Sequence, residues 1–538
     1  MKNVSFLCIC ICLMQACSQP SVKNTGSAGS YDYLYHNLPF EMQRVEEPVF
    51  PANNVDIAAY GGVPDGITLN TGAFAEALDV LSGKGGGTLS VSKGIWLTGP
   101  ITLQSNINLH LEEGAVLLFT KDLEQYPVIS TNYEGRAAQR CQAPVSAKGA
   151  TNIAITGKGV IDGSGEAWRP VKKMKMTENQ WKALLASGGT LNAKGDIWSP
   201  SEKERFRPVM ISLQECNKVL LEGVTFQNSP AWNIHPLMCR NLTVRDIAVR
   251  NPWYSQNGDG IDLESCAGVV VTGSTFDVGD DGICIKSGKD EEGRKRGIPC
   301  ENILVDNCIV YHGHGGFVVG SEMSGGVRNI KVSNCTFLGT DVGLRFKSTR
   351  GRGGVVENIH ISNIAMLNIP TEPLLFDLFY GGSSPIPDGD EPAKDGKAET
   401  VNFPVNEGTP QFKDIYISNV TCNGAARAMF FNGLPEMNVS NIHINDISIT
   451  AERGAEISRS DGVELTNVKI RAAKGAALIL RNAKNINVEN FVFDVAGSEK
   501  VNVAGSESKN IRITKSGVGK NDIIVDKTAD AGQVDISD

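Results

Sequence analysis

A short phrase that recurs along most of the chain constrains the fold more than any other feature of the sequence. Each copy begins with a turn-forming Asn or Asp, alternates apolar and polar residues, turns at a second polar pair and then resumes. Copies begin at Asn152, Asn217, Asn241, Asn302, Asn329, Asn358, Asp414, Asn441, Asn485 and Asn510. Alternation with a period of two predicts short β-strands that are buried on one side.

The spacing of the copies indicates how these strands are arranged. Successive copies are separated by about 21 to 30 residues, which matches one coil of a parallel β-helix rather than a propeller blade. The copies lack the leucines at fixed offsets that a leucine-rich repeat requires. We therefore expect an all-β chain that folds as a single-stranded right-handed parallel β-helix, with a continuous core of Val, Ile, Phe and Cys.

A solenoid also needs a cap at its open end. Residues 57–62 predict a strand, and residues 70–81 predict an amphipathic helix. Its apolar side chains fall at helical spacing, so we expect them to face inward and the helix to close the N-terminal end. These are Phe74, Ala77, Leu78 and Leu81.

Two stretches interrupt the repeat. Residues 132–208 carry one coil, around residues 152–163, and then a basic helical patch at residues 171–186. Trp168, Trp181 and Trp198 flank this patch, and such residues either stack on sugar rings or pack a long loop on its own core. Residues 376–405 are rich in Gly, Pro and Asp, which suits a rim loop over a cleft.

Charge and cysteine usage exclude two classes of function. A formal net charge of -9 and a pI near 5.5 leave no dominant basic face for nucleic acid. The chain has 13 cysteines, but no CxxC pair has the partners of a zinc site. Many recur at intervals of one coil, which favours burial in the core. A disulfide between Cys300 and Cys308 remains an alternative if the chain is exported.

Four polar clusters stand out between residues 257 and 347. They are Asn257-Gly-Asp259-Gly, Gly-Asp280-Asp281-Gly, Gly-His314-Gly and Arg345-Phe-Lys347. About one repeat separates each cluster from the next, so a β-helix would stack them on neighbouring coils of one face. Three carboxylates, a histidine and two cations would then converge. Crowded carboxylates cannot all ionise easily, so at least one pKa should rise, as acid catalysis of glycoside hydrolysis requires.

In type, order and spacing, these clusters resemble the signature of glycoside hydrolase family 28, the polygalacturonases and their relatives. The resemblance runs from about residue 55 to about residue 349. It implies that Asp280 is the general acid, that Asp259 and Asp281 position and deprotonate the attacking water, and that hydrolysis proceeds by single displacement with inversion. It also places His314 beside the acid, with His312 as a rival.

The resemblance further implies a pectic oligosaccharide or polysaccharide as the substrate, bound by Arg345, Lys347, Asn257 and Lys286. Arg345 and Lys347 alternate with Phe346, so both project to one face and can meet sugar carboxylates. We expect cleavage of α-1,4-galacturonosidic bonds, with exo action if residues 132–208 wall off one end of the groove. No metal or organic cofactor is expected.

Three alternatives stay open from sequence. One is a hydrolase of rhamnogalacturonan or another decorated pectin. The second is a β-helix pectate lyase, which would need a carboxylate cluster that binds calcium. The third is a noncatalytic polysaccharide-binding β-helix, which would not need this set of acids, histidine and cations.

The N-terminus predicts export. Lys2 precedes an apolar run at residues 6–14, too short for the ~20 residues that span a bilayer, and Ala16 precedes Cys17. This resembles a bacterial lipoprotein signal at residues 1–16, with Cys17 lipidated; an ordinary secretion signal and a transmembrane anchor are the alternatives. Residues 17–50 predict a flexible spacer and lead-in, and residues 51–538 the catalytic β-helix domain. We expect a monomer, anchored to the outer membrane on its periplasmic or outer face only through lipid.

Overall fold

A computed structural model describes residues 31–381, 401–495 and 500–537. Residues Met1–Leu38 form one compact unit, of which the 3-10 helix η1 (Asp32–Tyr35) is described, and residues Pro39–Asp538 form another. In the described part of the chain, no helix has the length and apolar character needed to cross a bilayer. Cys17 lies outside the described residues.

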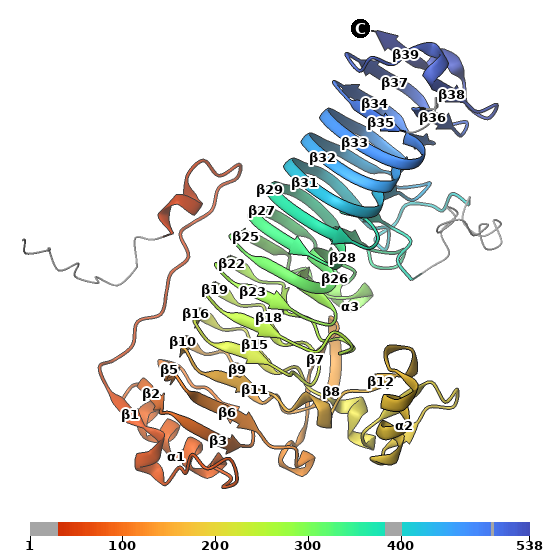
Figure 1. Cartoon of the computed structure of the whole chain (residues 1–538). Coiled ribbons are helices and arrows are strands. Elements are labelled where there is room, and N and C mark those ends of the chain that lie inside the picture. The colour runs from red at the N-terminus through yellow and green to blue at the C-terminus, as the bar shows by residue number, and fades with distance from the viewer. Residues whose placement is uncertain (1–30, 382–400, 496–499, 538) are drawn as a thin grey trace, which may run out of the picture. The chain divides into compact units, whose positions relative to one another are not determined.

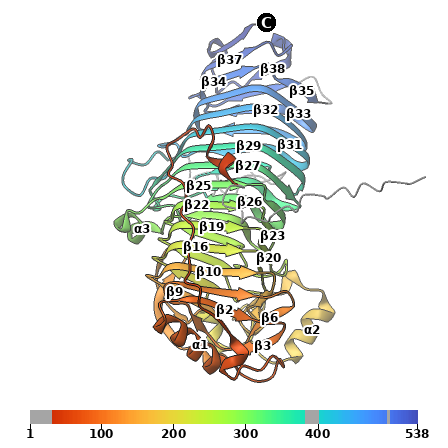
Figure 2. The same ribbon diagram turned by 90° about the vertical axis from the view of Figure 1, so that its left-hand side faces the viewer.

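The larger unit confirms the predicted fold. Its strands pair in parallel from coil to coil, and the coils stack one above another (Figures 1 and 2). Three ladders of strands run along the stack and meet where long strands bend from one ladder into the next.

The first ladder contains β1 (Asn54–Asp56), β2 (Gly87–Val91), β5 (Ile107–Leu111), β10 (Thr151–Gly157), β16 (Asn217–Glu222), β19 (Arg240–Arg245), β22 (Ala267–Thr272), β25 (Cys300–Asp306), β27 (Val327–Leu338), β29 (Val355–Ile369), β31 (Gln411–Asn432), β32 (Val439–Ser458), β33 (Ser460–Arg481), β34 (Lys484–Glu489), β37 (Lys509–Thr514) and β39 (Val534–Ser537). The second contains β3 (Gly94–Thr98), β6 (Ala115–Phe119), β11 (Val160–Asp162), β17 (Thr225–Gln227), β20 (Ala248–Arg250), β23 (Thr275–Asp277), the start of β26 (Ile309–Gly320), later parts of β27, β29 and β31 to β33, and β35 (Val492–Val495).

The third ladder, here called the site sheet, contains β4 (Ile101–Thr102), β9 (Val145–Lys148), β15 (Ile211–Gln214), β18 (Ile234–Leu237), β21 (Ile261–Glu264), β24 (Asp281–Lys286), the end of β26, β28 (Thr340–Lys347), β30 (Leu374–Asp377), the ends of β31 to β33, β36 (Val501–Ala504) and β38 (Ile523–Val525). Parallel pairing joins β15 to β18, β18 to β21, β21 to β24, β24 to β26 and β26 to β28.

The asparagines that begin the repeats hold the turns between coils. Asn302, Asn329 and Asn358 all have φ near +55°, a left-handed conformation that Asn tolerates better than most residues. Asn329 donates a side-chain hydrogen bond to Asn302 (3.0 Å), and Asn358 donates to Asn329 (2.7 Å). Each turn is therefore tied to the turn below it.

Apolar side chains fill the interior in columns, as the repeat predicts. Leu221, Val244, Val271 and Val305 occupy the same register on successive strands and are almost completely buried. The described cysteines, including Cys300 and Cys308, are buried free thiols, so the disulfide alternative is wrong.

The cap matches its prediction closely. Helix α1 (Thr71–Gly83) buries Phe74, Ala77, Leu78 and Leu81 against the first coils. The strand predicted at residues 57–62 is wrong: Ile57–Tyr60 is a 3-10 helix, η2, because Asp56 caps it by accepting from the amide of Ala58.

The first insertion folds differently from the prediction. Its helix, α2, spans only Glu178–Ala186, since Thr177 and Gln180 form a capping box at its start. The stretch before it forms β12 (Val171–Lys172), which pairs with β14 (Ile197–Ser199) in a small antiparallel sheet with β13 (Thr190–Leu191). Trp168, Trp181 and Trp198 are buried in local clusters, which supports the packing alternative over sugar stacking.

Two further features of the larger unit bear on the predictions. Part of the predicted spacer lies on the solenoid, because Glu46 pairs with Lys218 (2.6 Å) and Glu47 with Arg245 (2.5 Å). The second insertion, residues 376–405, falls largely outside the described residues.

Candidate active site

Neighbouring strands of the site sheet bring the four predicted clusters together. Asp259 directly precedes β21, and Asp281 opens β24. His314 lies within β26, and Arg345 and Lys347 lie on β28. Because these strands are adjacent and parallel, residues separated by whole coils in sequence become neighbours on one face.

The three carboxylates form a tight cluster. One oxygen each of Asp259, Asp280 and Asp281 lies within 4.8 Å of the others. Asp259 and Asp281 are buried, whereas Asp280 is partly accessible. The glycines beside them permit close packing: a Cβ atom on Gly260 would lie 2.4 Å from the carbonyl oxygen of Gly282. The glycine brackets in the sequence therefore serve the approach of neighbouring coils.

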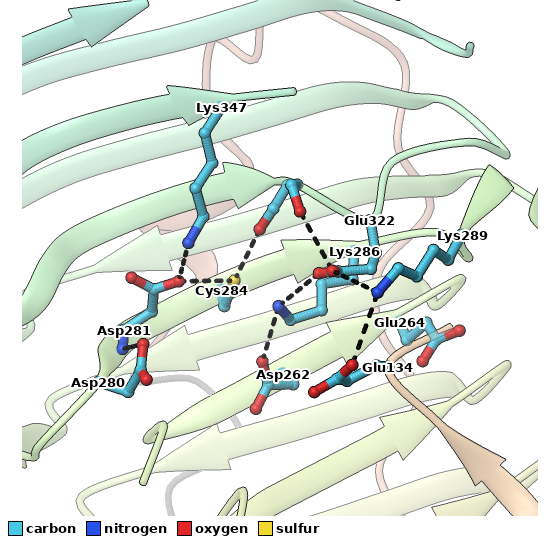
Figure 3. A network of polar contacts seen from close by, with 12 residues as sticks. Glu134, Asp262, Glu264, Asp280, Asp281, Cys284, Lys286, Lys289, Glu322 and Lys347 are labelled. Atoms are coloured by element: carbon cyan, nitrogen blue, oxygen red, sulfur yellow. Dashed lines mark hydrogen bonds and ion pairs between the residues drawn. The ribbon is translucent and has the colours of Figure 1, made fainter. Parts of the chain in front are cut away.

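Two cations fix the ionisation of Asp281. Lys347 Nζ lies 2.6 Å from Asp281 Oδ2, and Arg345 Nη1 lies 3.2 Å from Oδ1 (Figure 3 shows the lysine contact). Burial by itself would raise the pKa of Asp281, but the charges of Lys347 and Arg345 hold that pKa below its ordinary value. Asp281 is therefore an anion over the working pH range.

Asp259 is in the opposite situation. Burial, and then the charges of Asp262 and Asp280, raise the pKa of Asp259 well above its ordinary value. Its Oδ1 atom has no hydrogen-bond partner among the described residues. The cluster thus combines a carboxyl group whose pKa is lowered with one whose pKa is raised, as the crowding of the sequence motifs predicts.

Of the two candidate histidines, the structure places His314 at the cluster. His314 Nδ1 lies 3.3 Å from Asp280 Oδ1, and its Nε2 lies 3.8 Å from Asp341 Oδ2. The hydrogen bond to Asp280 raises the pKa of His314, with smaller contributions from the charges of Asp281 and Asp341. His312 is mostly exposed and pairs instead with Asp277 at 2.8 Å.

The structure places Asn257 beside an arginine. Arg207 Nη2 donates to Asn257 Oδ1 (2.7 Å), and its Nη1 donates to the carbonyl oxygen of Gln256 (2.9 Å). Asn257 has φ of +53°. Arg207 therefore anchors the turn that delivers Asp259.

Lys286 belongs to a buried ion cluster rather than to an open surface. Its Nζ lies 3.0 Å from Glu322 and 3.6 Å from Asp262 (Figure 3). It also lies 4.7 Å from the ring centre of Trp232. Although burial favours the neutral acid, the charges of Lys286 and Lys347 lower the pKa of Glu322 to about 2. The charge of Lys286 is thus compensated by protein.

Sequence reasoning missed several residues of the site. Asp262 occupies an outward position of a strand that alternates Ile, Asp, Leu and Glu, and this was the one available signal for it. Tyr380 follows the loop after β30 and carried no signal, yet its ring centre lies 5.1 Å from Lys347 Nζ and 5.7 Å from Arg345 Cζ. Its partly exposed ring lies at the cationic side of the site.

A hairpin, here called the strap, crosses the site sheet next to the carboxylates. It consists of β7 (Val128–Tyr133) and β8 (Arg136–Cys141). At one flank Gln214 donates to Thr131 (2.8 Å), and the Tyr133 ring lies 5.1 Å from that of Trp232. The strap therefore rests on the sheet just before β21.

The tip of the strap is attached beyond β24. The amide of Lys289 donates to the carbonyl oxygen of Gly135 (3.2 Å), and Arg136 forms an ion pair with Asp290 at the start of α3 (Asp290–Arg296). The amide of Ala137 donates to Glu292 (2.9 Å). These contacts hold the tip of the strap beside the end of β24.

Removing the cation nearest to Asp281 tests this electrostatic account. In Lys347→Met, burial is no longer offset, so the pKa of Asp281 should rise by about one to three units. The acidic limb of the pH profile of kcat/KM should then move to higher pH by a comparable amount. Lys331→Met, which removes a lysine from β27 on the first ladder, is the control and should leave that limb in place. An acidic limb that stays in place in Lys347→Met, whatever the overall loss of activity, would contradict the account.

Comparison with known proteins places this geometry among related chains. Residues 171–459 match the model of glycosyl hydrolases family 28. A probable polygalacturonase of Vitis vinifera is 32% identical over 70% of this chain and 76% of its own. An exo-poly-alpha-D-galacturonosidase of Dickeya chrysanthemi is 27% identical over 77% of this chain and 71% of its own. The crystal structure of an exopolygalacturonase from Thermotoga maritima superposes with a TM-score of 0.62 at 31% identity, covering 82% of this chain and 94% of its own.

Proposed function

Because the chain belongs to glycosyl hydrolases family 28 and is therefore a glycosidase, we propose that it hydrolyses the α-1,4-galacturonosidic bonds of polygalacturonate and pectic oligomers. The observation that carries this proposal is the joint presence of Arg345 and Lys347 beside the carboxylate cluster, where both contact Asp281. Their cationic groups lie where a sugar carboxylate could bind. Such local attraction would act against the net charge of -9, which repels polygalacturonate over the rest of the surface.

The geometry supports different catalytic roles for Asp259, Asp280 and Asp281. Asp281, held as an anion, is suited to deprotonate the attacking water, and Asp259 is close enough to help orient it. Asp280 is the accessible carboxyl of the cluster, so it can reach the leaving oxygen and we assign it the protonation step; His314 contacts it. The proposed general acid, Asp280, thus has His314 beside it, and the proposed base, Asp281, has Arg345 and Lys347 beside it.

The stereochemical outcome follows from single displacement and is inversion of the anomeric carbon. Inverting glycosidases usually separate their two carboxyl groups by about 6.5 to 9.5 Å, wider than the oxygen spacing in this cluster. A water bound beside Asp281 and Asp259, rather than between an acid and a distant base, reconciles the compact cluster with direct attack by water.

Incubation with oligogalacturonides tests the reaction itself. The protein lacking residues 1–17 should release reducing ends without unsaturated sugar, and proton NMR should show the β-anomer first. Asp280→Asn should lower kcat by at least about 100-fold, since general acid catalysis contributes about 10² to 10⁴. EDTA should not change the rate, because no step of the proposal requires a metal.

Other products would redirect the assignment. Unsaturated sugar would indicate a lyase that uses the carboxylate cluster for calcium. Turnover of rhamnogalacturonan oligomers in place of oligogalacturonides would indicate a decorated pectin as the substrate.

We further propose that the enzyme acts from chain ends. The strap is bonded to β15, before the acid strands, and to residues 289–292, after β24, so it borders the site beside the carboxylates and limits the room for a polymer there. A substrate bound across Asp280 would therefore have only a short segment on the strap side.

Shortening the strap tests this mode of action. Ser130 pairs with Gln139, so a two-glycine turn can replace residues 131–138. The natural chain should release only the smallest product at early times, whereas the shortened variant should release a mixed ladder of oligomers. Arg328→Ala, which breaks an exposed ion pair with Glu301, serves as a control and should keep the single early product. A mixed ladder from the natural chain would contradict chain-end action.

We also propose that the chain is exported and anchored to the outer membrane by lipid on Cys17, as a monomer. The support is the short apolar run followed by Ala16 and Cys17. Radiolabelled palmitate should label the natural chain, and Cys17→Ser should remove the label. Labelling that persists in Cys17→Ser would contradict the anchor.

A further inference from the structure

A cavity lies on the site sheet beside the strap, over coils that precede those of the catalytic carboxylates. Its floor includes Ser146 and Lys148 of β9 and Ser212 and Gln214 of β15, and residues 129–133 of the strap form a wall. The sheet order puts β9 and β15 before β18, whereas the acids lie at β21 and β24. The cavity therefore lies on earlier coils of the same sheet than the acids.

The cavity is lined by buried polar atoms that lack partners. Asn132 Oδ1, Tyr133 Oη and Arg140 Nε are each buried without a hydrogen-bond partner in the described structure. The Tyr133 side chain is only 6% exposed. Buried polar atoms in folded proteins are usually paired with protein or water. Asn132, Tyr133 and Arg140, which line the cavity, have an amide, a phenol and a guanidinium, groups that suit a ligand with both hydroxyl groups and an anionic group.

The charged residues that line the cavity are all cations. Arg140 and Lys148 line the cavity, and no Asp or Glu is among the described lining residues. The Arg140 guanidinium lies 3.9 Å from the ring centre of Tyr133, and its Nη1 donates to the carbonyl oxygen of Arg205 (2.6 Å). Among the described residues, no carboxylate oxygen lies within 4.0 Å of the charged nitrogens of Arg140 or Lys148. In a protein of net charge -9, this favours a carboxylate ligand.

The size and shape of the cavity limit the ligand to one ring. Its volume is about 150 Å³, and a cavity of that order accepts a six-membered ring such as benzene. Ala143, Pro208 and Val209 give one side an apolar surface that can contact the C–H face of a pyranose.

From these observations we propose that the cavity is a binding site for a single sugar acid of the uronate class, separate from the catalytic site. That the natural ligand is the galacturonate released by hydrolysis rests on the proposed function. Since Asn132 and Tyr133 belong to the strap, an occupied cavity also holds the strap against β15.

Titration calorimetry with free galacturonate tests the proposal. The natural chain should show two binding events. In Arg345→Gln/Lys347→Gln, which removes the cations of the catalytic side, one event should remain. Adding Arg140→Gln and Lys148→Gln should weaken that event at least 10-fold. Galactose, the same ring without the carboxylate, should bind this site at least 10-fold more weakly than galacturonate.

A cavity-filling variant gives a second test that leaves all four cations in place. Ser146→Trp should abolish the event that survives in Arg345→Gln/Lys347→Gln, while hydrolysis of trigalacturonate by Ser146→Trp in the otherwise natural chain continues. Loss of all binding in Arg345→Gln/Lys347→Gln, or binding unaffected by Ser146→Trp and by the Arg140 and Lys148 changes, would overturn the proposal. If the natural chain binds galacturonate at the cavity but does not hydrolyse oligogalacturonides, the proposed function fails and the second site stands.

Discussion

Parallel pairing between successive coils is the interaction on which the rest of this structure depends. A single coil cannot bury its own apolar side chains, so each coil is stable only against its neighbours. Pairing in register then forces every second side chain of the site sheet outward at the same height on each coil. The turns keep this register because Asn329 and its equivalents accept a left-handed conformation and bond to the turn below. The active site inherits its precision from these contacts rather than from a flexible loop.

The same register concentrates charge. Asp259, Asp281 and Lys347 lie on coils whose neighbouring strands are about 4.8 Å apart, with β26 between the strands of Asp281 and Lys347, so burial affects all three and Coulomb interactions between them are strong. Whether a given carboxylate ionises then depends on its nearest cation. Asp281 has two cations in contact and Asp259 has none, which separates their pKa values although their sequence settings are alike. The same holds for cations: Glu322 and Asp262 lie beside Lys286 and compensate its charge.

The insertions decide how much of the sheet a substrate can reach. A β-helix without them would present one continuous groove. In this chain the hairpin Val128–Cys141 crosses the sheet and is bonded to β15 on one side and to α3 on the other. The hairpin borders the catalytic site, and a small cavity lined by Arg140 and Lys148 lies beside it. The strap thus links the proposed chain-end action with the proposed second site.

The sequence by itself determined the repeat, the capping helix and the identity of the four site clusters. Each depends on local periodicity or on residue types that a turn requires, as at Asn329 and Phe74, and such signals are visible without knowing the neighbours. It did not determine the strap, the 3-10 helix at Ile57–Tyr60, the short span of α2 or the free thiols of Cys300 and Cys308. Nor did it show that the pKa values of Asp259 and Asp281 shift in opposite directions. It also did not show that Lys286 pairs with Glu322 and Asp262, or that Tyr380 lies near Arg345 and Lys347. Those features depend on contacts between residues far apart in the chain, and on burial, which only the stacked coils create.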